Sequence, residues 1–119
     1  MIKLVGVNTI TGGGTGTTYV HGIFNAHGYG ATPGGLITIT AEDIASLSIN
    51  MSSAGTGVIV NGISGKVSQR VNDGGVIISG KADVSITAVG ASSVFGIRTA
   101  EQYATPPVDD KVSILDDAS

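Results

Sequence analysis

Two histidines and two tyrosines lie close together near the N-terminus, in the segment YVHGIFNAHGYG. Tyr19 and His21 share one face if the segment is extended, and His27 and Tyr29 follow the bend expected after them. Imidazole nitrogens are common ligands of divalent metals, so the histidines are a candidate metal site. Their spacing matches no zinc signature and no third ligand is near in the sequence, so we predict no metal site. We interpret the segment as a polar surface strand that packs aromatic rings or contacts a partner.

Asp43 and Asp83 are the carboxylates whose spacing best suits a catalytic pair, because they occupy the same position in two similar segments. A glycoside hydrolase needs two carboxyl groups roughly 5–10 Å apart. If each segment forms two stacked coils, the two aspartates lie about 10 Å apart. An aspartate at a strand start more commonly forms a turn with its own backbone, so we predict no catalytic residue. The acidic pairs Glu42-Asp43 and Asp109-Asp110 lack the spacing of a calcium loop, so we also predict no cofactor.

Composition argues against several other chemistries. The segment Gly12–Gly16 lacks the lysine and the following helix of a phosphate-binding loop, and the chain has no cysteine for thiol catalysis or disulfides. The net charge is −3 without a basic cluster, which argues against nucleic-acid binding. No stretch approaches the roughly 20 apolar residues that span a bilayer, so we predict no contact with a membrane.

The elements that must position these residues are β-strands. The 119 residues include 19 glycines, 14 isoleucines, 13 valines and 12 threonines. Branched residues fit a pleated, half-buried surface, and frequent glycine is typical of tight turns. In Leu36–Thr40, Ile37 and Ile39 take one face and the threonines the other, which is the alternation of a strand. The sequence therefore predicts an all-β protein.

The chain also repeats itself. A V-x-G-I motif is followed by a glycine pair, a branched run and an aspartate, and the spacing of successive motifs is 40 and then 34 residues. The predicted equivalences are Gly22-Ile23 with Gly62-Ile63 and Gly96-Ile97, Gly34-Gly35 with Gly74-Gly75, Leu36-Ile37 with Val76-Ile77, and Asp43-Ile44 with Asp83-Val84. Repeats of this length indicate stacked structural units.

Each unit contains three expected strands. They are Thr18–Phe24, Leu36–Thr40 and Ile44–Ile49 in the first unit, and Val58–Ile63, Val76–Ser79 and Val84–Ala88 in the second. Two architectures satisfy the pattern: a short β-solenoid with about two coils of ~20 residues per unit, or an antiparallel β-sandwich or small barrel. The preserved glycine spacing favours the solenoid, because stacked coils need equal geometry in successive turns.

A boundary is expected at Thr105-Pro106-Pro107, because consecutive prolines favour an extended link. We predict a repeat domain over residues 1–107, with repeats at about 17–56 and 57–90 and a partial one at 91–115, and a C-terminal arm or capping strand over 108–119. Such an arm can add a strand to a neighbouring subunit. The candidate oligomer-interface residues are Val108, Val112, Ile114 and Leu115 of the arm, with Tyr19, His21 and Tyr29.

The motifs V-x-G-I, G-G-x-I-x-I and D-V-x-I-T-A resemble the glycine-rich β-helical repeats of bacterial autotransporter passengers and large adhesins. They are also similar to β-helical segments of phage tailspikes and fibres. The resemblance covers about residues 17–100. It implies adhesion or particle structure, since the enzymatic members of those families carry additional carboxylates at fixed positions. The chain is far shorter than an ordinary passenger and its N-terminus lacks a signal-peptide pattern, which favours the phage resemblance.

These observations lead to a functional expectation. We expect a non-enzymatic structural component of a bacteriophage particle, such as a capsid decoration or tail-fibre protein, located in the virion. The expected partners are further copies of the chain or neighbouring virion proteins, and surface glycans. The alternative is a segment of an extracellular adhesin or surface filament at the cell surface, and a weaker alternative is a carbohydrate-processing β-helix.

Overall fold

The structure is a computed structural model that describes residues 1–25, 36–65, 75–98 and 111–119. These residues form strands, turns and connections without a helix, which confirms the all-β prediction. No helix in the described part of the chain is long and apolar enough to cross a membrane. His27, Tyr29, Gly34, Val108 and the pair Asp109-Asp110 lie outside the described residues.

The strands form two sheets, and every pairing among the described strands is parallel. The larger sheet contains β1 (Ile2–Lys3), β2 (Val7–Gly13), β4 (Leu36–Ser53), β6 (Gly75–Gly90) and β8 (Lys111–Ile114), and the smaller contains β3 (Tyr19–Phe24), β5 (Ile59–Ser64) and β7 (Val94–Arg98). The antiparallel sandwich or barrel is therefore not the arrangement that these strands adopt.

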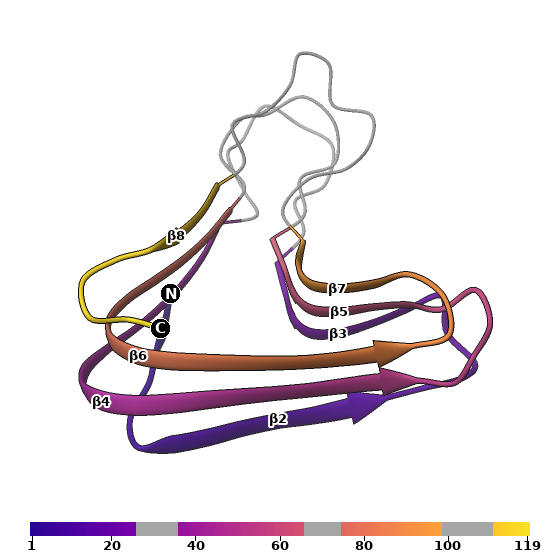
Figure 1. The fold of residues 1–119 in the computed structure, drawn as a ribbon, viewed down its shortest axis with the longest axis horizontal. Coiled ribbons are helices and arrows are strands. Elements are labelled where there is room, and N and C mark those ends of the chain that lie inside the picture. Colours follow the sequence, from indigo (N-terminus) through magenta and orange to yellow (C-terminus); the bar gives the residue numbers. More distant parts are fainter. Residues whose placement is uncertain (26–35, 66–74, 99–110) are drawn as a thin grey trace, which may run out of the picture.

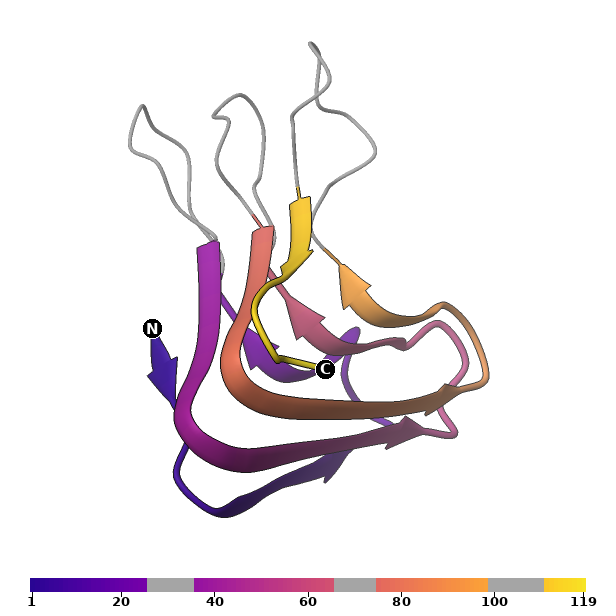
Figure 2. The ribbon, with the colours of Figure 1, turned by 60° about the vertical axis from the view of Figure 1, so that its left-hand side comes forward.

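The chain passes through the larger sheet and then the smaller one three times, and we call each passage a level. Level 1 contains β1, β2 and β3, level 2 contains β4 and β5, level 3 contains β6 and β7, and β8 begins level 4. Figures 1 and 2 show the levels lying over one another, with β3, β5 and β7 running back above the second half of the long strands. The molecule is thin in one direction, with extents of 38 × 35 × 17 Å.

The register of the smaller sheet confirms the repeat spacing. Ile23 pairs with Ile63, and Ile63 pairs with Ile97, which gives the predicted steps of 40 and 34 residues. The predicted alignment of the larger sheet was wrong. Leu36 pairs with Gly75 instead of Val76, and Asp83 pairs with Ser46 instead of Asp43. Each repeat also makes one level, so the expected two coils per unit were wrong as well.

A bend in the long strands explains the misalignment at Asp83, whereas the one-residue misalignment at Leu36 precedes the bend. Between Ala41 and Ala45, β4 has two more residues than β6 has between their partners Gly80 and Ala82. In β6 the bend is made by Gly80, whose φ of 70° is in the left-handed region that favours glycine. A Cβ atom added there would also lie 2.2 Å from the carbonyl oxygen of Ala41. Pairing stops at Ala41–Gly80 and resumes at Ala45–Ala82 with a shifted register, so each pair of expected strands is one long bent strand.

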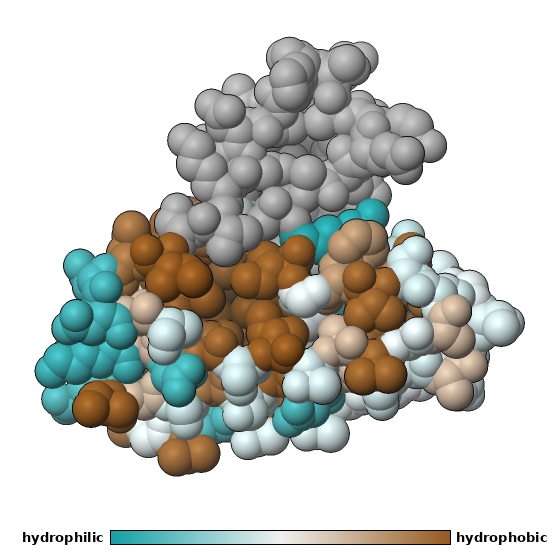
Figure 3. Space-filling view, in the orientation of Figure 1, coloured by the Kyte–Doolittle hydropathy of each residue, from teal (hydrophilic) through white to brown (hydrophobic). Residues whose placement is uncertain are grey.

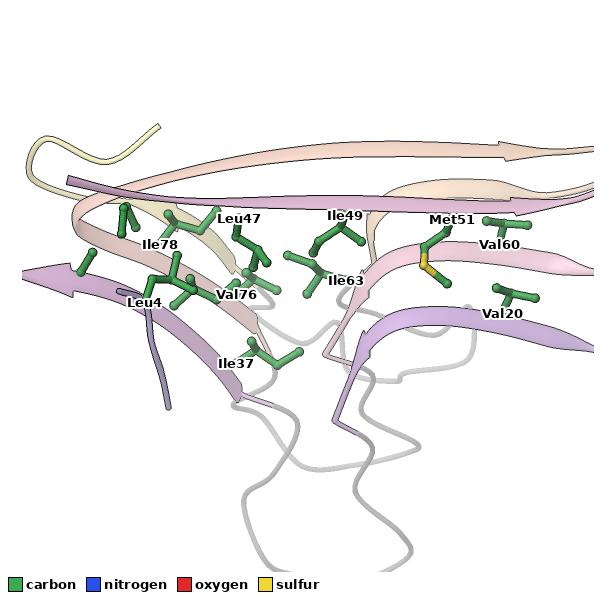
Figure 4. Packing of buried hydrophobic residues seen from close by; sticks show 14 of the residues in the cluster. Leu4, Val20, Ile37, Leu47, Ile49, Met51, Val60, Ile63, Val76 and Ile78 are labelled. Atoms are coloured by element: carbon green, nitrogen blue, oxygen red, sulfur yellow. The ribbon is translucent and has the colours of Figure 1, made fainter. Parts of the chain in front are cut away.

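The core lies between the two sheets and inside the bend. In β4 the buried residues alternate with more exposed ones before and after the bend, as the alternation of Ile37 and Ile39 predicted. Ile39 and Ile49 are fully buried. Figure 4 shows Leu47, Ile49 and Met51 pointing from one side toward Ile63 and Val60 on the other. Packing between the sheets therefore depends on residues of all three levels.

The C-terminal segment pairs with the chain's own β6. β8 extends the larger sheet beside Gly75–Ile78. After a turn at Asp116, whose φ is 62°, the backbone of Ser119 donates to Ala82 and accepts from Val84 at 2.9 and 2.7 Å. This segment covers the edge of β6 up to Val84. The boundary at residue 107 remains a prediction, because residues 99–110 are not described.

Candidate functional site

The most distinctive feature for function is a pair of sheet edges at opposite ends of the stack. In the described topology β3 and β7 each pair only with β5, so each leaves one edge without a strand. β2 pairs only with β4, and the second half of β6 also pairs only with β4. Open edges present backbone N–H and C=O groups that can pair with another strand.

The side chains between the sheets form ladders that are complete only in the middle of the stack. The ladders are Ile10–Ile49–Ile86 in the larger sheet and Val20–Val60–Val94 and Ile23–Ile63–Ile97 in the smaller. Every middle member is fully buried. Val94 is 38% exposed, although Val20 at the other end of its ladder is buried, and both outer isoleucines of each isoleucine ladder are only partly buried. Figure 3 shows apolar side chains gathered on one end face between the two sheets.

Three glycines form a column beside these ladders. A Cβ atom added to Gly22 would lie 2.6 Å from the carbonyl oxygen of Gly62, and one added to Gly62 would lie 2.6 Å from that of Gly96. Among the described residues, nothing lies within 4 Å of the same position on Gly96. Gly96 therefore occupies the same register position as the other two but lacks the next strand that makes glycine necessary there.

Polar ladders cover the outer face of the larger sheet. Thr9, Ser48 and Ser85 are in register, and the Ser85 hydroxyl donates to that of Ser48 at 3.1 Å. Thr11, Asn50 and Thr87 form the next ladder, and all three are exposed. This face thus carries short hydroxyl and amide side chains in register from one level to the next.

Aromatic rings stack along β3 at the other face of the smaller sheet. The ring centres of Tyr19 and His21 are 5.7 Å apart, and those of His21 and Phe24 are 4.3 Å apart. Both pairs are stacked. In β7 the guanidinium of Arg98 lies 4.9 Å from the centre of the Phe95 ring, a cation–π contact. These contacts confirm that β3 carries a packed aromatic strip, and His21 is occupied by ring stacking.

Asn61 lies between these two aromatic groups, since it pairs with His21 on one side and Phe95 on the other. It is fully buried, and neither polar atom of its side chain has a hydrogen-bond partner within the described part of the chain. Sequence reasoning missed Asn61, Phe95 and Arg98. Asn61 and Phe95 come directly before a Gly-Ile motif, and Arg98 comes directly after one. This common position indicates a shared site only once the strands that carry the three motifs are known to lie side by side.

The predicted interface residues divide between the two ends of the stack. Tyr19, 42% exposed, and His21 belong to level 1 of the smaller sheet, whereas Ile114 and Leu115, 57% and 48% exposed, belong to level 4 of the larger one. The backbone of Val112 pairs with Val76. Tyr29 and Val108 lie outside the described residues. The structure thus does not bring these candidates together on one surface.

The two aspartates considered as a catalytic pair lie in different levels and are not in register. Asp43 is exposed in the bend of β4, and Asp83 lies in the next level opposite Ser46, with an oxygen 3.4 Å from the Ser119 hydroxyl. A shallow pocket near them is lined by Ile44, Lys81, Ala82, Asp83, Asp117 and Ser119. Among the described residues no three His, Cys, Asp or Glu side chains come close enough to hold a metal.

One ion pair joins levels 1 and 2 at the bend. The Lys3 ammonium donates to a Glu42 carboxylate oxygen at 2.5 Å, and both side chains are more than half exposed. The hydrogen bond from Lys3, together with its positive charge, lowers the pKa of Glu42 below the ordinary value of 4.5. Because both side chains are largely exposed, the pair contributes little to the stability of the fold.

Comparisons with protein families, curated proteins and solved structures found no match to the chain.

Proposed function

We propose that the chain is a short β-solenoid in which each level is one coil. The parallel register between levels supports this proposal, as do the ladders of identical residues through all three levels. A solenoid built of coils that contact only their neighbours needs its end coils covered. Here the second half of β6 and the whole of β7 lack a covering strand in the described topology.

We further propose that the protein is a non-enzymatic structural component of a virus particle, from a bacteriophage, and that it acts by joining β-sheet edges. The observation that carries the proposal is the pair of open parallel edges with incomplete apolar ladders at both ends. In such a joint, pairing of the backbones provides the affinity, and the buried side-chain ladders determine the register. The partners are copies of the chain or neighbouring virion proteins.

Mass spectrometry of purified particles from the source of this sequence tests the particle role. A structural component is expected at a fixed molar ratio to the major shell or tail protein through successive density gradients. Loss of the chain during the first gradient, or its recovery only in cell-envelope fractions, would contradict the particle role. Recovery in the envelope would favour the adhesin alternative.

A further inference from the structure

We propose that the partner at these edges is a second copy of the same chain, which stacks head to tail so that its level 1 continues the level 3 of the first copy. This proposal rests on the proposed assembly role and names its partner. The two ends of one chain belong to one continuous parallel stack, so the N-terminal end has the geometry that the C-terminal end lacks.

The register of the joint follows from the register inside the chain. β2 of the second copy takes the place beside β6 that β6 itself takes beside β4, which puts its Ile10 opposite Ile86 and its Thr11 opposite Thr87. By the same rule β3 of the second copy pairs with β7. The strands remain parallel, and the two sheets continue from one copy into the next.

The joint completes the three apolar ladders. By the registers within the chain, Ile10, Val20 and Ile23 of the second copy extend the ladders that end at Ile86, Val94 and Ile97. The end members then gain the neighbours that bury Ile49, Val60 and Ile63 completely. Like residues meet like residues, so no polar side chain is buried against an apolar one in these three ladders.

Gly96 provides an independent reason for a further strand. Gly22 and Gly62 must lack a side chain because the next strand's carbonyl lies 2.6 Å from the Cβ position, whereas Gly96 has open space there. Gly22 of a second copy would place its carbonyl at that position. The described part of the single chain gives no steric reason for glycine at residue 96, and the joint does.

The C-terminal segment limits the length of the joint. Ser119 occupies the β6 edge at Ala82 and Val84, so pairing with a second copy begins at Ser85. By the internal register, Val7 of the second copy would fall opposite Asp83. The same rule would put Ile2 of the second copy opposite Ile78, where β8 already lies. The residues of the second copy before Thr9, which include β1, must therefore lie aside, or the C-terminal segment must leave the edge.

A cysteine pair tests the joint, because the chain has no cysteine of its own. Thr11→Cys with Thr87→Cys places the two thiols on neighbouring strands of different copies, with Cα atoms about 5 Å apart. A disulfide needs Cα atoms within about 7 Å. Within one chain the two positions are separated by the strand of Asn50, hence about 10 Å apart, so the bridge can form only between copies.

The double variant is expected to give a ladder of disulfide-linked species on mild oxidation, because a head-to-tail joint leaves an open edge at each end. Thr9→Cys with Thr87→Cys, shifted by two residues, is the register control and is expected to give at least tenfold less product. Efficient dimers from Thr11→Cys alone would show a symmetric joint between N-terminal ends and would overturn the proposal, as would a double variant that stays monomeric.

Gly96→Ala provides the matched test without cysteine. It is expected to leave the monomer's thermal midpoint unchanged while weakening self-association at least tenfold in sedimentation, and Ala54→Val, an exposed change in the middle level, is expected to alter neither. Equal association of Gly96→Ala and the parent chain would overturn the joint. A chain that does not self-associate but is found in particles would contradict only this inference, whereas a self-associating chain absent from particles would contradict only the particle role.

Discussion

Gly62 determines how closely the two sheets approach in the middle level. A Cβ atom there would lie 2.2 Å from a methyl group of Ile86 and 2.6 Å from the carbonyl oxygen of Gly96. Both neighbours belong to level 3, so this one residue joins the packing between sheets to the pairing between levels. In the same column, Gly22 is likewise crowded by the next level, whereas Gly96 has no described neighbour at its Cβ position. Gly62 and Gly96 can therefore be compared by the same substitution.

Gly62→Ala is expected to destabilise the monomer by about 1–3 kcal/mol, because the added methyl must displace a strand or an isoleucine. Gly96→Ala adds the same methyl in open space and is its control. Urea unfolding at low protein concentration measures both. A Gly62→Ala midpoint equal to that of Gly96→Ala would contradict the close approach of β5 to β6 and β7.

The Lys3–Glu42 pair gives a prediction of pH dependence. Because the folded-state pKa of Glu42 is lowered, the pair's contribution is present above about pH 4.5 and is lost as the pH falls through the folded-state pKa. Lys3→Ala is expected to return the Glu42 pKa to its ordinary value, and high salt is expected to shift it in the same direction. Side-chain NMR titration measures the pKa, and an unchanged value in Lys3→Ala would exclude the pair.

At the scale of the strand, the bend determines how much of the fold the sequence could predict. The alternation of Ile37 and Ile39 was visible in the sequence because period-two burial is a local property. The register beyond the bend was not, since the two additional residues of β4 before Ala45 look like ordinary strand sequence. The smaller sheet has the same Gly-Ile pair in each strand, and there the predicted alignment was correct.

Deletions at the bend test this interpretation. Removing both Asp43 and Ile44, with Ala41→Gly, gives β4 the length of β6 and keeps Leu47 facing the core, so a folded protein is expected. Removing Asp43 alone moves every following side chain to the opposite face, and loss of cooperative unfolding is expected. Circular dichroism and thermal unfolding distinguish the two; equal behaviour would contradict the assigned register.

The isoleucine ladder predicts that position in the stack determines the cost of a lost methyl group. Ile49→Val is expected to cost about 0.5–1.5 kcal/mol, as for a fully buried isoleucine. Ile86→Val and Ile10→Val are expected to cost less than half of that in the monomer, because both side chains are only partly buried. Urea unfolding of the three variants measures the order, and an Ile86→Val cost as large as that of Ile49→Val would argue against an open end.

At the scale of the whole molecule, the repeat predicted the stacking but not that each repeat forms a single level. Composition gave the all-β class, and the steps of 40 and 34 residues gave the pairing of β3, β5 and β7. The course of the chain within one level depends on where the long strands bend. Those bends lie at Gly80 in β6 and between Ala41 and Ala45 in β4, and they depend on local packing. The candidate interface residues were taken from one sequence segment at a time, whereas the open edges are formed by both ends of the chain.

Backbone NMR contacts test the parallel stack most directly. The structure predicts contacts between the amide and Hα protons of neighbouring strands that join β2 to β4 and β4 to β6, with Ser48 linked to both Thr9 and Ser85. Strong Hα–Hα contacts between strands consecutive in the chain, such as β2 with β3 or β5 with β6, mark antiparallel pairs and would contradict the stack.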